Sequence, residues 1–263
     1  MLSLHQVVDS LYTQARPVLT WYGPDRVELG GPVLARWFSK TANLLTHEYT
    51  DLYAPSPGAS QHMVVDLPSC WQKIIWVSAA TLCGWTVTIP PRQEGFTAHE
   101  SPGDALVHDD SPTAEPTSLP PVTVYVTNHL SAAAERAQEE GADLFLHNLA
   151  FLALQWEEEL PAAAIDALEA LMSHNDILEH EHEAQDWPPR TMRSSAGDTA
   201  APVLSSSHTL SDTERCVFHE GDALTLCAPL TALWAQAGSA IVIDPAYYDN
   251  VDEIMLTERP HNA

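Results

Sequence analysis

The densest group of potential metal ligands in this 263-residue sequence is HNDILEHEHE, residues 174–183. A metal site needs side chains that converge on one point, which on a helix requires a spacing of three or four residues. Asp176 and His180 have that spacing, whereas His180 and His182 would share a face only on an extended strand. His180 and His182 are therefore candidate zinc or nickel ligands, but we predict a solvated acidic segment with no resident metal.

Motifs for nucleophilic or nucleotide chemistry are missing from the sequence. There is no Gly-x-Ser-x-Gly, and Ser205 to His208 (SSSH) lies in a stretch without periodicity. No Gly-x-Gly-x-x-Gly occurs, which removes the usual dinucleotide site. The acidic run Glu157–Glu159 fits a solvated helix face better than a general acid and base. We assign no catalytic residue and expect no cofactor.

The charge balance narrows the classes of partner. The sequence has 36 acidic and 11 basic residues, with a formal net charge of -25. Such a surface repels phosphate backbones and anionic lipids, so we predict neither a nucleic-acid nor a membrane partner. A charge that only confers solubility and a basic protein partner both stay open.

The cysteines and the first residues indicate a compartment. Cys70, Cys83, Cys216 and Cys227 are far apart and form no Cys-x-x-Cys pair, so we expect reduced thiols rather than a zinc site or a disulfide framework. Met1 to Leu11 lacks the basic start of a signal peptide. Both features favour the cytoplasm.

The elements that must position any site are organised around residues 61–91. A β-branched run, Met63 to Leu67, predicts a strand, and apolar residues at helical spacing predict a helix from Ile74 to Cys83. Gly84 ends this helix, and Trp85 to Ile89 predicts a second strand before two prolines. Strand, helix and strand over so few residues are typical of a crossover between parallel strands.

The segments on either side follow the same rules. Before this unit we predict a helix, two strands around a turn at residues 23–26, and another helix: Leu4 to Ala15, residues 17–31, and Val33 to His47. After it we predict short strands at Ala105 to His108 and Val122 to Thr127, a helical segment from Ser131 to Met172 broken at Pro161, and a loop from Ser173 to Ser211. A second unit follows, with a strand Ala223 to Cys227, a helix Pro229 to Ala237, a strand Ala240 to Ile243 and a last helix Ala246 to Thr257.

The predicted fold class is α/β, with two lobes built on strand–helix–strand units. We place the first lobe at residues 1–130, a helical segment with an acidic, Ser- and Pro-containing linker at 131–211, and the unit that completes the second lobe at 212–263. Four tryptophans lie on apolar faces and are predicted to be core residues: Trp37, Trp71, Trp76 and Trp85.

Taken together, these segments resemble the start of the adenylate-forming superfamily, which includes acyl-CoA synthetases, luciferases and adenylation domains. The resemblance rests on a strand ending in Leu67-Pro68, a helix, Gly84, and a strand ending at Pro90. Still closer is a small group of short, uncharacterised relatives, which share two motifs: Trp37-x-x-Lys40-Thr41-Ala42-Asn43-Leu44-Leu45 and Leu67-Pro68-x-x-Trp71-Gln72. The resemblance covers about half of the chain.

The resemblance implies a place for an ATP-binding loop, rich in Ser, Thr and Gly and followed by a lysine, between the two units. The candidate region, Pro188 to Ser211, has Gly197 as its one glycine and no lysine, so it lacks the backbone nest and the cation that would hold phosphates. The later adenine, ribose and catalytic-lysine motifs would lie beyond Ala263. ATP or AMP binding is therefore not expected.

The resemblance also implies that the helix around Trp234 corresponds to an acyl-pocket helix, which suggests a small apolar pocket at Pro229, Leu230 and Trp234. The resulting hypothesis is a non-catalytic or vestigial relative of these enzymes that acts as a binding or partner-interaction module. One alternative is a residual acyl- or nucleotide-binding enzyme. Another is a metal- or pH-responsive protein that works through its 13 histidines.

Overall fold

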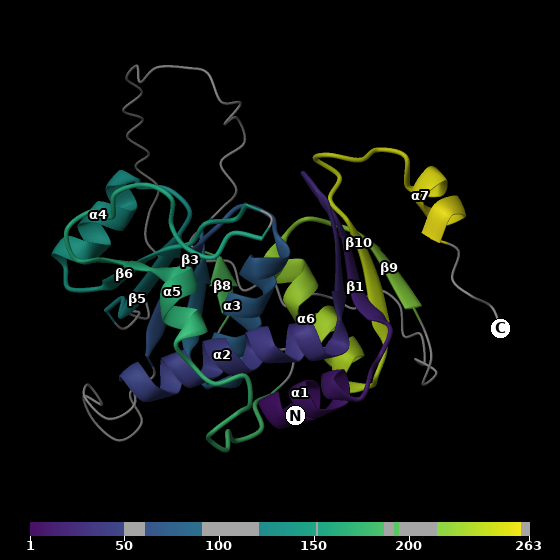
Figure 1. The fold of residues 1–263 in the computed structure, drawn as a ribbon, viewed down its shortest axis with the longest axis horizontal. Coiled ribbons are helices and arrows are strands. Elements are labelled where there is room, and N and C mark those ends of the chain that lie inside the picture. The colour runs from purple at the N-terminus through teal and green to yellow at the C-terminus, as the bar shows by residue number, and fades with distance from the viewer. Residues whose placement is uncertain (50–60, 91–120, 151, 187–191, 195–214, 259–263) are drawn as a thin grey trace, which may run out of the picture.

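A computed structural model of the chain describes residues 1–49, 61–90, 121–150, 152–186, 192–194 and 215–258, with 192–194 described as backbone. Its strands form two sheets (Figure 1). In the larger sheet all pairings are parallel. Its strands, in spatial order, are β7 (Ala164–Asp166), β6 (Asp143–Leu146), β5 (Val124–Thr127), β3 (His62–Asp66), β4 (Thr86–Ile89) and β8 (Met192–Ser194).

The smaller sheet joins the two ends of the chain. Its order is β2 (Arg26–Gly30), β1 (Pro17–Tyr22), β10 (Ser239–Ile243) and β9 (Arg215–His219). The hairpin β1–β2 is antiparallel, whereas β1 pairs with β10, and β10 with β9, in parallel. The N-terminal hairpin therefore shares a sheet with the last strands of the described chain.

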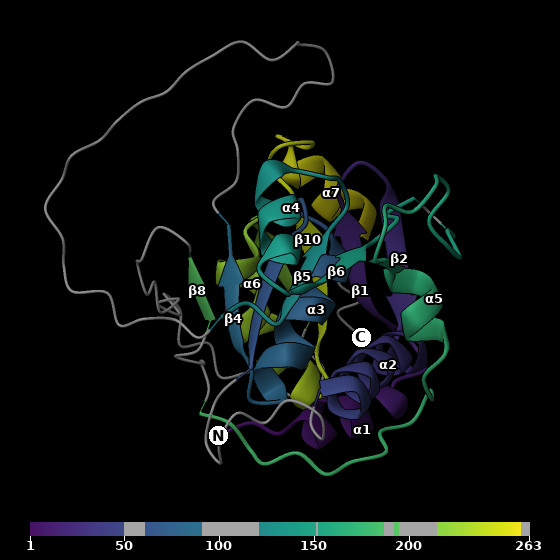
Figure 2. The same ribbon diagram turned by 90° about the vertical axis from the view of Figure 1, so that its left-hand side faces the viewer.

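Helices fill the space between the sheets and cover their outer faces (Figures 1 and 2). The middle layer consists of α1 (Leu4–Tyr12), α2 (Gly31–Tyr49), α3 (Trp71–Leu82) and α6 (Ala223–Ala235), which contact one another. On the outer faces α4 (Ala132–Glu139) packs on the larger sheet and α7 (Val251–Glu258) on the smaller one. The short α5 (Ala167–Met172) follows β7 and packs against α2.

Alternation along the strands explains these layers. In β3, Met63 and Val65 face the central core, whereas Val64 joins the cluster beneath α4. In β10, Ala240 and Val242 face the same central core, and Ile241 and Ile243 face α7. Successive strand side chains point to opposite faces, so strands that are apolar throughout must be covered on both sides.

The structure confirms the α/β class and the crossover around residues 61–91. The strands β3 and β4 are parallel neighbours with α3 between them in sequence, as the β-branched runs predict. The N-terminal helix, the hairpin and the helix after it are also present as α1, β1–β2 and α2. Trp76 and Trp85 are buried, and Trp37 and Trp71 pack against the same core at partial exposure.

The predicted strand at Ala223 to Cys227 is wrong, because these residues begin α6. Asp222 caps this helix by accepting a hydrogen bond from the Leu224 amide, which commits the backbone to a helical turn. The helix is apolar around most of its circumference, because it packs on both α1 and α3. Such a sequence has no amphipathic contrast to distinguish helix from strand.

The predicted helical segment from Ser131 to Met172 is also wrong over most of its length. Only α4 and α5 at its two ends are helical, and the strands β6 and β7 lie between them. Gly141, at a positive φ of 99°, follows the end of α4 and turns the chain into β6. Pairing of β6 with β5, which is set by residues distant in sequence, overrides the helical composition.

Two further boundaries differ from the prediction. The last helix begins at Val251 rather than Ala246, because residues 244–248 form a turn in which the Asp244 carbonyl accepts from the amides of Tyr247 and Tyr248. The predicted loop at 173–211 contains a strand, β8, which pairs with β4. The predicted strand at Ala105 to His108 lies outside the described residues. Among the described residues no helix has the length and hydropathy needed to span a membrane.

Candidate functional site

The carboxyl ends of the parallel strands are where open α/β sheets bind ligands. Five groups lie at these ends: Asp66 at β3, His147 after β6, Asp166 at β7, Gly221 after β9 and Asp244 after β10. The two sheets meet at this edge, because the Ser69 hydroxyl, in the loop after β3, donates to the Gly221 carbonyl at 2.7 Å. This junction is therefore the centre of the candidate site.

Lys73 is the cation of the junction. Its side chain, in the first turn of α3, is buried, and its Nζ donates to the Leu67 carbonyl at 2.6 Å. Burial lowers the pKa of Lys73, against the opposing effect of Cys70 and of the carboxylates of Asp222 and Asp66. Sequence reasoning missed this residue, although a lysine that begins an otherwise uncharged helix is a usable signal.

The carboxylates beside Lys73 have structural partners. Asp66 accepts a hydrogen bond from the Tyr125 hydroxyl at 2.9 Å, and burial with this neighbouring carboxylate raises the pKa of Tyr125. Asp222 caps α6. Both carboxylates therefore have hydrogen-bond partners within the protein, although Asp66 is half-buried and Asp222 is exposed.

Three thiols, at the junction (Cys70 and Cys227) and at the far end of α3 (Cys83), are held in the unreactive form. Burial raises the pKa of Cys70 to about 11 and the pKa values of Cys83 and Cys227 to about 12. The nucleophile in cysteine chemistry is the thiolate, which is scarce at neutral pH when the pKa is so high. These three cysteines therefore act as small apolar side chains.

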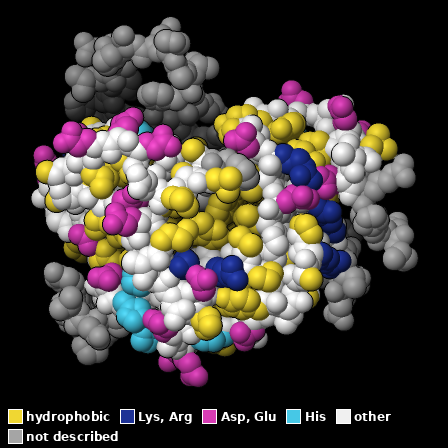
Figure 3. Space-filling model, in the orientation of Figure 1, with side chains coloured by type: hydrophobic (Ala, Val, Ile, Leu, Met, Phe, Trp, Pro, Cys, Tyr) yellow, Lys and Arg dark blue, Asp and Glu magenta, His cyan; other side chains and the backbone are white. Residues whose placement is uncertain are grey.

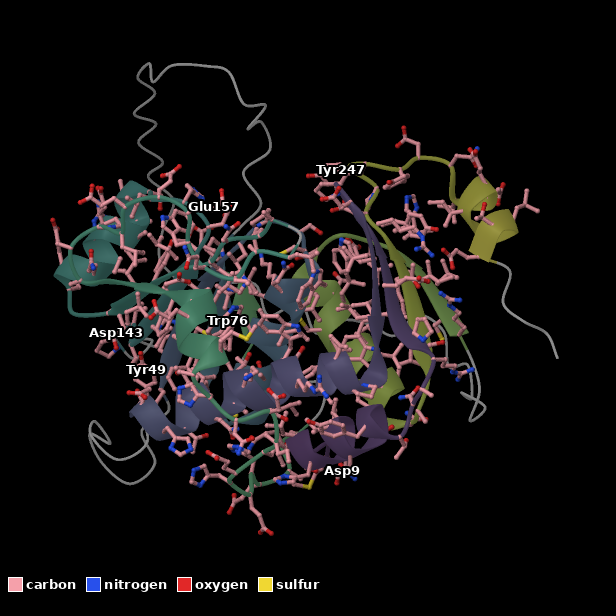
Figure 4. The ribbon with its side chains drawn as sticks, in the orientation of Figure 1. Asp9, Tyr49, Trp76, Asp143, Glu157 and Tyr247 are labelled. Atoms are coloured by element: carbon pink, nitrogen blue, oxygen red, sulfur yellow. The ribbon has the colours of Figure 1, made fainter. Side chains whose placement is uncertain are left out.

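His147 is the second buried titratable group at this edge. Its Nδ1 accepts from the indole Nε1 of Trp76, labelled at the centre of Figure 4, at 3.3 Å. Burial lowers the pKa of His147 to about 4, with the Asp166 carboxylate opposing the shift, so the ring is neutral at pH 7. With Nδ1 as the acceptor, the proton belongs to Nε2, which has no hydrogen-bond partner among the described residues.

The two candidate metal ligands, His180 and His182, contact different side chains. The Nε2 of His180 lies 3.3 Å from the Nε2 of His47, which in turn lies 2.5 Å from a Glu179 oxygen. The Nε2 of His182 lies 3.9 Å from the sulfur of Cys83. In the part of the chain that the structure describes, no group of three or more His, Cys, Asp or Glu side chains is arranged to hold a metal ion.

The residues of the two sequence motifs have structural roles. Trp37 of the first motif and Trp71 of the second contact each other edge to face, with ring centroids 5.5 Å apart. Lys40 donates to the His174 carbonyl at 2.6 Å, and Asn43 donates to the carbonyls of residues 175 and 177. These contacts fix residues 174–185, which we call the strap, across α2.

The predicted apolar pocket residues lie on α6. Leu230 and Trp234 are fully buried in the central core, and Pro229 is half-buried. The Trp234 indole donates to the Val18 carbonyl at 3.1 Å, and its ring lies 6.0 Å from that of Phe38. Trp234 thus packs against α2 and β1, and a cavity beside Leu230 and Trp234 stays a prediction.

Comparison with known proteins identifies solved structures that have a similar fold. No family model and no curated protein matches this sequence. Among solved structures, the chain is similar to the crystal structure of Brucella canis acyl-CoA synthetase, with 16% identity, a TM-score of 0.55, and coverage of 98% of this chain and 46% of that one. It also matches O-succinylbenzoate coenzyme A synthetase from Bacillus subtilis in complex with AMP, with 9% identity, a TM-score of 0.49, and coverage of 97% and 59%.

The chain therefore has an α/β fold similar to part of the acyl-CoA synthetase structure, and it spans less than half the length of that protein. At such low identity the likeness concerns the fold alone. The activities of the two synthetases belong to those proteins.

Proposed function

We propose that this chain is a non-catalytic binding module on an adenylate-forming type of fold, and that it recognises a basic protein through its acidic surface. The observation that carries the proposal is that several of the described basic side chains are paired or buried, whereas acidic side chains remain in excess on the surface. Arg26 and Arg215 both pair with Glu258, and Lys40 pairs with Asp176 at 2.8 Å. Lys73 is buried.

The acidic side chains, in contrast, far outnumber these cations. In Figure 3 acidic side chains are spread over the visible face, whereas Lys and Arg gather over α2 and beside the smaller sheet. With a net charge of -25, this surface attracts cationic partners and steers their approach.

The state of the buried groups supports a binding role over catalysis. The thiols of Cys70 and Cys227 are protonated at neutral pH, and the amine of Lys73 is occupied by the Leu67 carbonyl. His147 is neutral, with one ring nitrogen engaged by Trp76. Lys73, His147 and Cys227 are buried, and the half-buried Cys70 is held as the thiol.

Calorimetric titration with a lysine peptide tests the proposal. An unrelated protein of similar size and net charge serves as the control, because any acidic surface binds such a peptide to some degree. We expect the chain to bind at least tenfold more tightly than the control, and binding to weaken as salt is added. Equal binding by the two proteins would contradict a specific role.

A thermal-shift series tests the alternatives. A ligand that binds only the folded chain raises its stability, by about 2.7 kcal/mol at a hundredfold excess over Kd. We expect no dose-dependent rise in Tm with ATP–Mg, AMP, coenzyme A or a fatty acid. A rise with a nucleotide would favour the enzyme alternative. A rise with zinc that is lost on replacing His180 and His182 would favour the metal-responsive one.

A further inference from the structure

A cavity of about 450 Å³ opens beside α7, at the carboxyl end of β1. Its walls include three tyrosine rings, two carboxylates and an apolar side chain: Tyr22, Tyr247, Tyr248, Asp249, Glu253 and Ile254. Figure 4 labels Tyr247 at the upper edge of the smaller sheet, well away from Trp76 in the core. The volume lies in the usual range of small-ligand sites, about 300–1,000 Å³.

Local backbone contacts bring the rings together. The turn after β10, closed by hydrogen bonds from the Tyr247 and Tyr248 amides to the Asp244 carbonyl, presents two tyrosines in succession. Tyr22 is the last residue of β1 and pairs with Ile243. The rings of Tyr22 and Tyr248 meet edge to face, with centroids 5.5 Å apart and planes at 87°.

A cation already lies over the Tyr22 ring, although Arg26 itself does not line the cavity. The Arg26 guanidinium lies 5.5 Å from the Tyr22 centroid, and the Tyr22 hydroxyl donates to Glu258 at 2.5 Å. These contacts fix Tyr22. Within the described residues Tyr247 has no such contact and is 51% exposed, so its ring is available to a ligand.

The lining has the chemistry of a cation site. Among the described residues that line it are Asp249 and Glu253 but no lysine or arginine. Aromatic faces attract ammonium groups through their quadrupole, and carboxylates add Coulomb attraction. Ile254 and the tyrosine rings also offer apolar surface to the methylenes of a long cationic side chain. We propose that this tyrosine cavity binds an alkylammonium group, supplied by a lysine of the basic partner; the inference rests on the proposed function.

Titration with N-acetyl-lysine methylamide, followed by NMR, tests the cavity directly. The neutral analogue N-acetyl-norleucine methylamide has the same backbone and nearly the same stem. We expect saturable shifts with the lysine compound that map to Tyr247, Tyr248 and α7, and no saturable shifts with the neutral analogue. Shifts of equal size with both compounds, or with neither, would overturn the proposal.

Variants of the chain separate the contribution of the Tyr247 ring, that of the Glu253 charge, and the effect of net charge. Tyr247→Ala is expected to weaken binding of the lysine compound about threefold or more, whereas Tyr247→Phe keeps the ring and should bind like the parent. Glu253→Gln should also weaken binding. Glu157→Gln removes an exposed charge in the loop after β6 and should leave binding unchanged. Equal weakening by Glu157→Gln and Glu253→Gln would assign the effect to net charge and overturn the cavity.

The lysine peptide and the free diamine cadaverine distinguish the source of the ammonium group. If a lysine of a partner protein supplies the ammonium group, the peptide should bind more tightly than cadaverine, and Tyr247→Ala should weaken its binding. Tighter binding of cadaverine would make a free amine the ligand and would overturn the assignment to a partner. Peptide binding that is unchanged in Tyr247→Ala would overturn the cavity and leave the proposed function standing. Failure of the peptide together with saturable binding of the lysine compound would contradict the proposed function and the assignment to a partner's lysine, and would leave the alkylammonium cavity standing.

Discussion

Lys73 and His147 show how burial decides what a titratable side chain does in this protein. Both lie at the edge where an α/β fold places ligands, and both have a lowered pKa. Each also has a protein partner, the Leu67 carbonyl and the Trp76 indole respectively. A perturbed pKa at this edge is therefore explained by packing, and it does not by itself indicate catalysis.

The neutral state of His147 predicts a pH dependence of stability. The folded-state pKa is about 4, so between pH 6.5 and 4 the unfolded chain takes up a proton that the folded chain does not. The free energy of unfolding should therefore fall as the pH decreases through this window, by up to about 1.4 kcal/mol per pH unit from this residue. The contribution is fully present above pH 6.5.

His147→Asn tests this expectation, because the asparagine oxygen can still accept from Trp76 but does not titrate. Urea unfolding across the window should give a shallower loss of stability for the variant than for the parent. His129→Asn, at an exposed histidine, should keep the parent slope. An unchanged slope in His147→Asn would mean that His147 is charged in the folded protein.

Gly221 marks a close approach that a side chain would block. A Cβ at this position would lie 2.7 Å from the Asp244 carboxylate, which is fully buried. We expect Gly221→Ala to lower the free energy of unfolding by about 1–3 kcal/mol. Gly30→Ala is the matched control, because a Cβ there meets nothing within 4 Å. Equal urea midpoints for the two variants would show that the loop after β9 moves aside without cost.

At the scale of elements, the strap (residues 174–185) forms no helix or strand of its own, and side chains from α1 and α2 hold it. Asn43, fully buried, donates to the carbonyls of Asn175 and Ile177 and accepts from the amide of Glu179. A bridge between Leu2 and Gln185 fixes the far end. The strap thus depends on a few side-chain contacts and not on a backbone ladder.

Asn43→Ala should release the strap while α2 stays folded. The change leaves two carbonyls and an amide without their partner, at a cost of about 1–3 kcal/mol. Amide exchange over residues 174–180 should accelerate about tenfold or more, with little change within α2. The control is Thr46→Ala, since the Thr46 hydroxyl donates within its own helix to Ala42. Parent-like exchange in Asn43→Ala would assign the anchoring to other contacts.

The sequence predicted elements well where local pattern and tertiary environment agree. The β-branched runs that became β3 and β4 are bounded by Pro68, Gly84 and Pro90, which mark the ends of each element. The prediction from sequence failed where a strand forms by pairing with residues that are distant along the chain. The residues of β6 lie in an Ala- and Glu-rich segment and become a strand by pairing with β5, and Gly141 was the local sign of the chain reversal that the composition concealed.

The site was harder to predict than the fold, because its groups come from separate segments. Trp37 and Trp71 were recognised as motif residues, but their mutual contact depends on the packing of α2 against α3. Similarly, Tyr22 and Tyr248 are brought together only when β1 pairs with β10. Spacing along the chain carries no information about such contacts.

For the whole molecule, the excess of negative charge opposes compactness. With a net charge of -25, mutual repulsion raises the free energy of the folded chain. Salt shortens the range of this repulsion, because the Debye length falls from about 30 Å at 0.01 M to about 8 Å at 0.15 M. We expect Tm to rise as sodium chloride is added across this range. Replacing Glu157, Glu158 and Glu159 together by glutamine should raise Tm at low salt and reduce its dependence on salt. A Tm independent of salt in both proteins would contradict this account.

The pairing of β1 with β10 has a consequence for synthesis on the ribosome. The Trp234 indole that bonds the Val18 carbonyl is 216 residues distant from it in sequence. At about 5–20 residues per second, this partner emerges roughly ten to forty seconds after the hairpin. During that interval the nascent chain carries an apolar hairpin whose β1 edge has no neighbour, the kind of surface that chaperones bind and that promotes misassembly. The smaller sheet closes only after β10 has been synthesised.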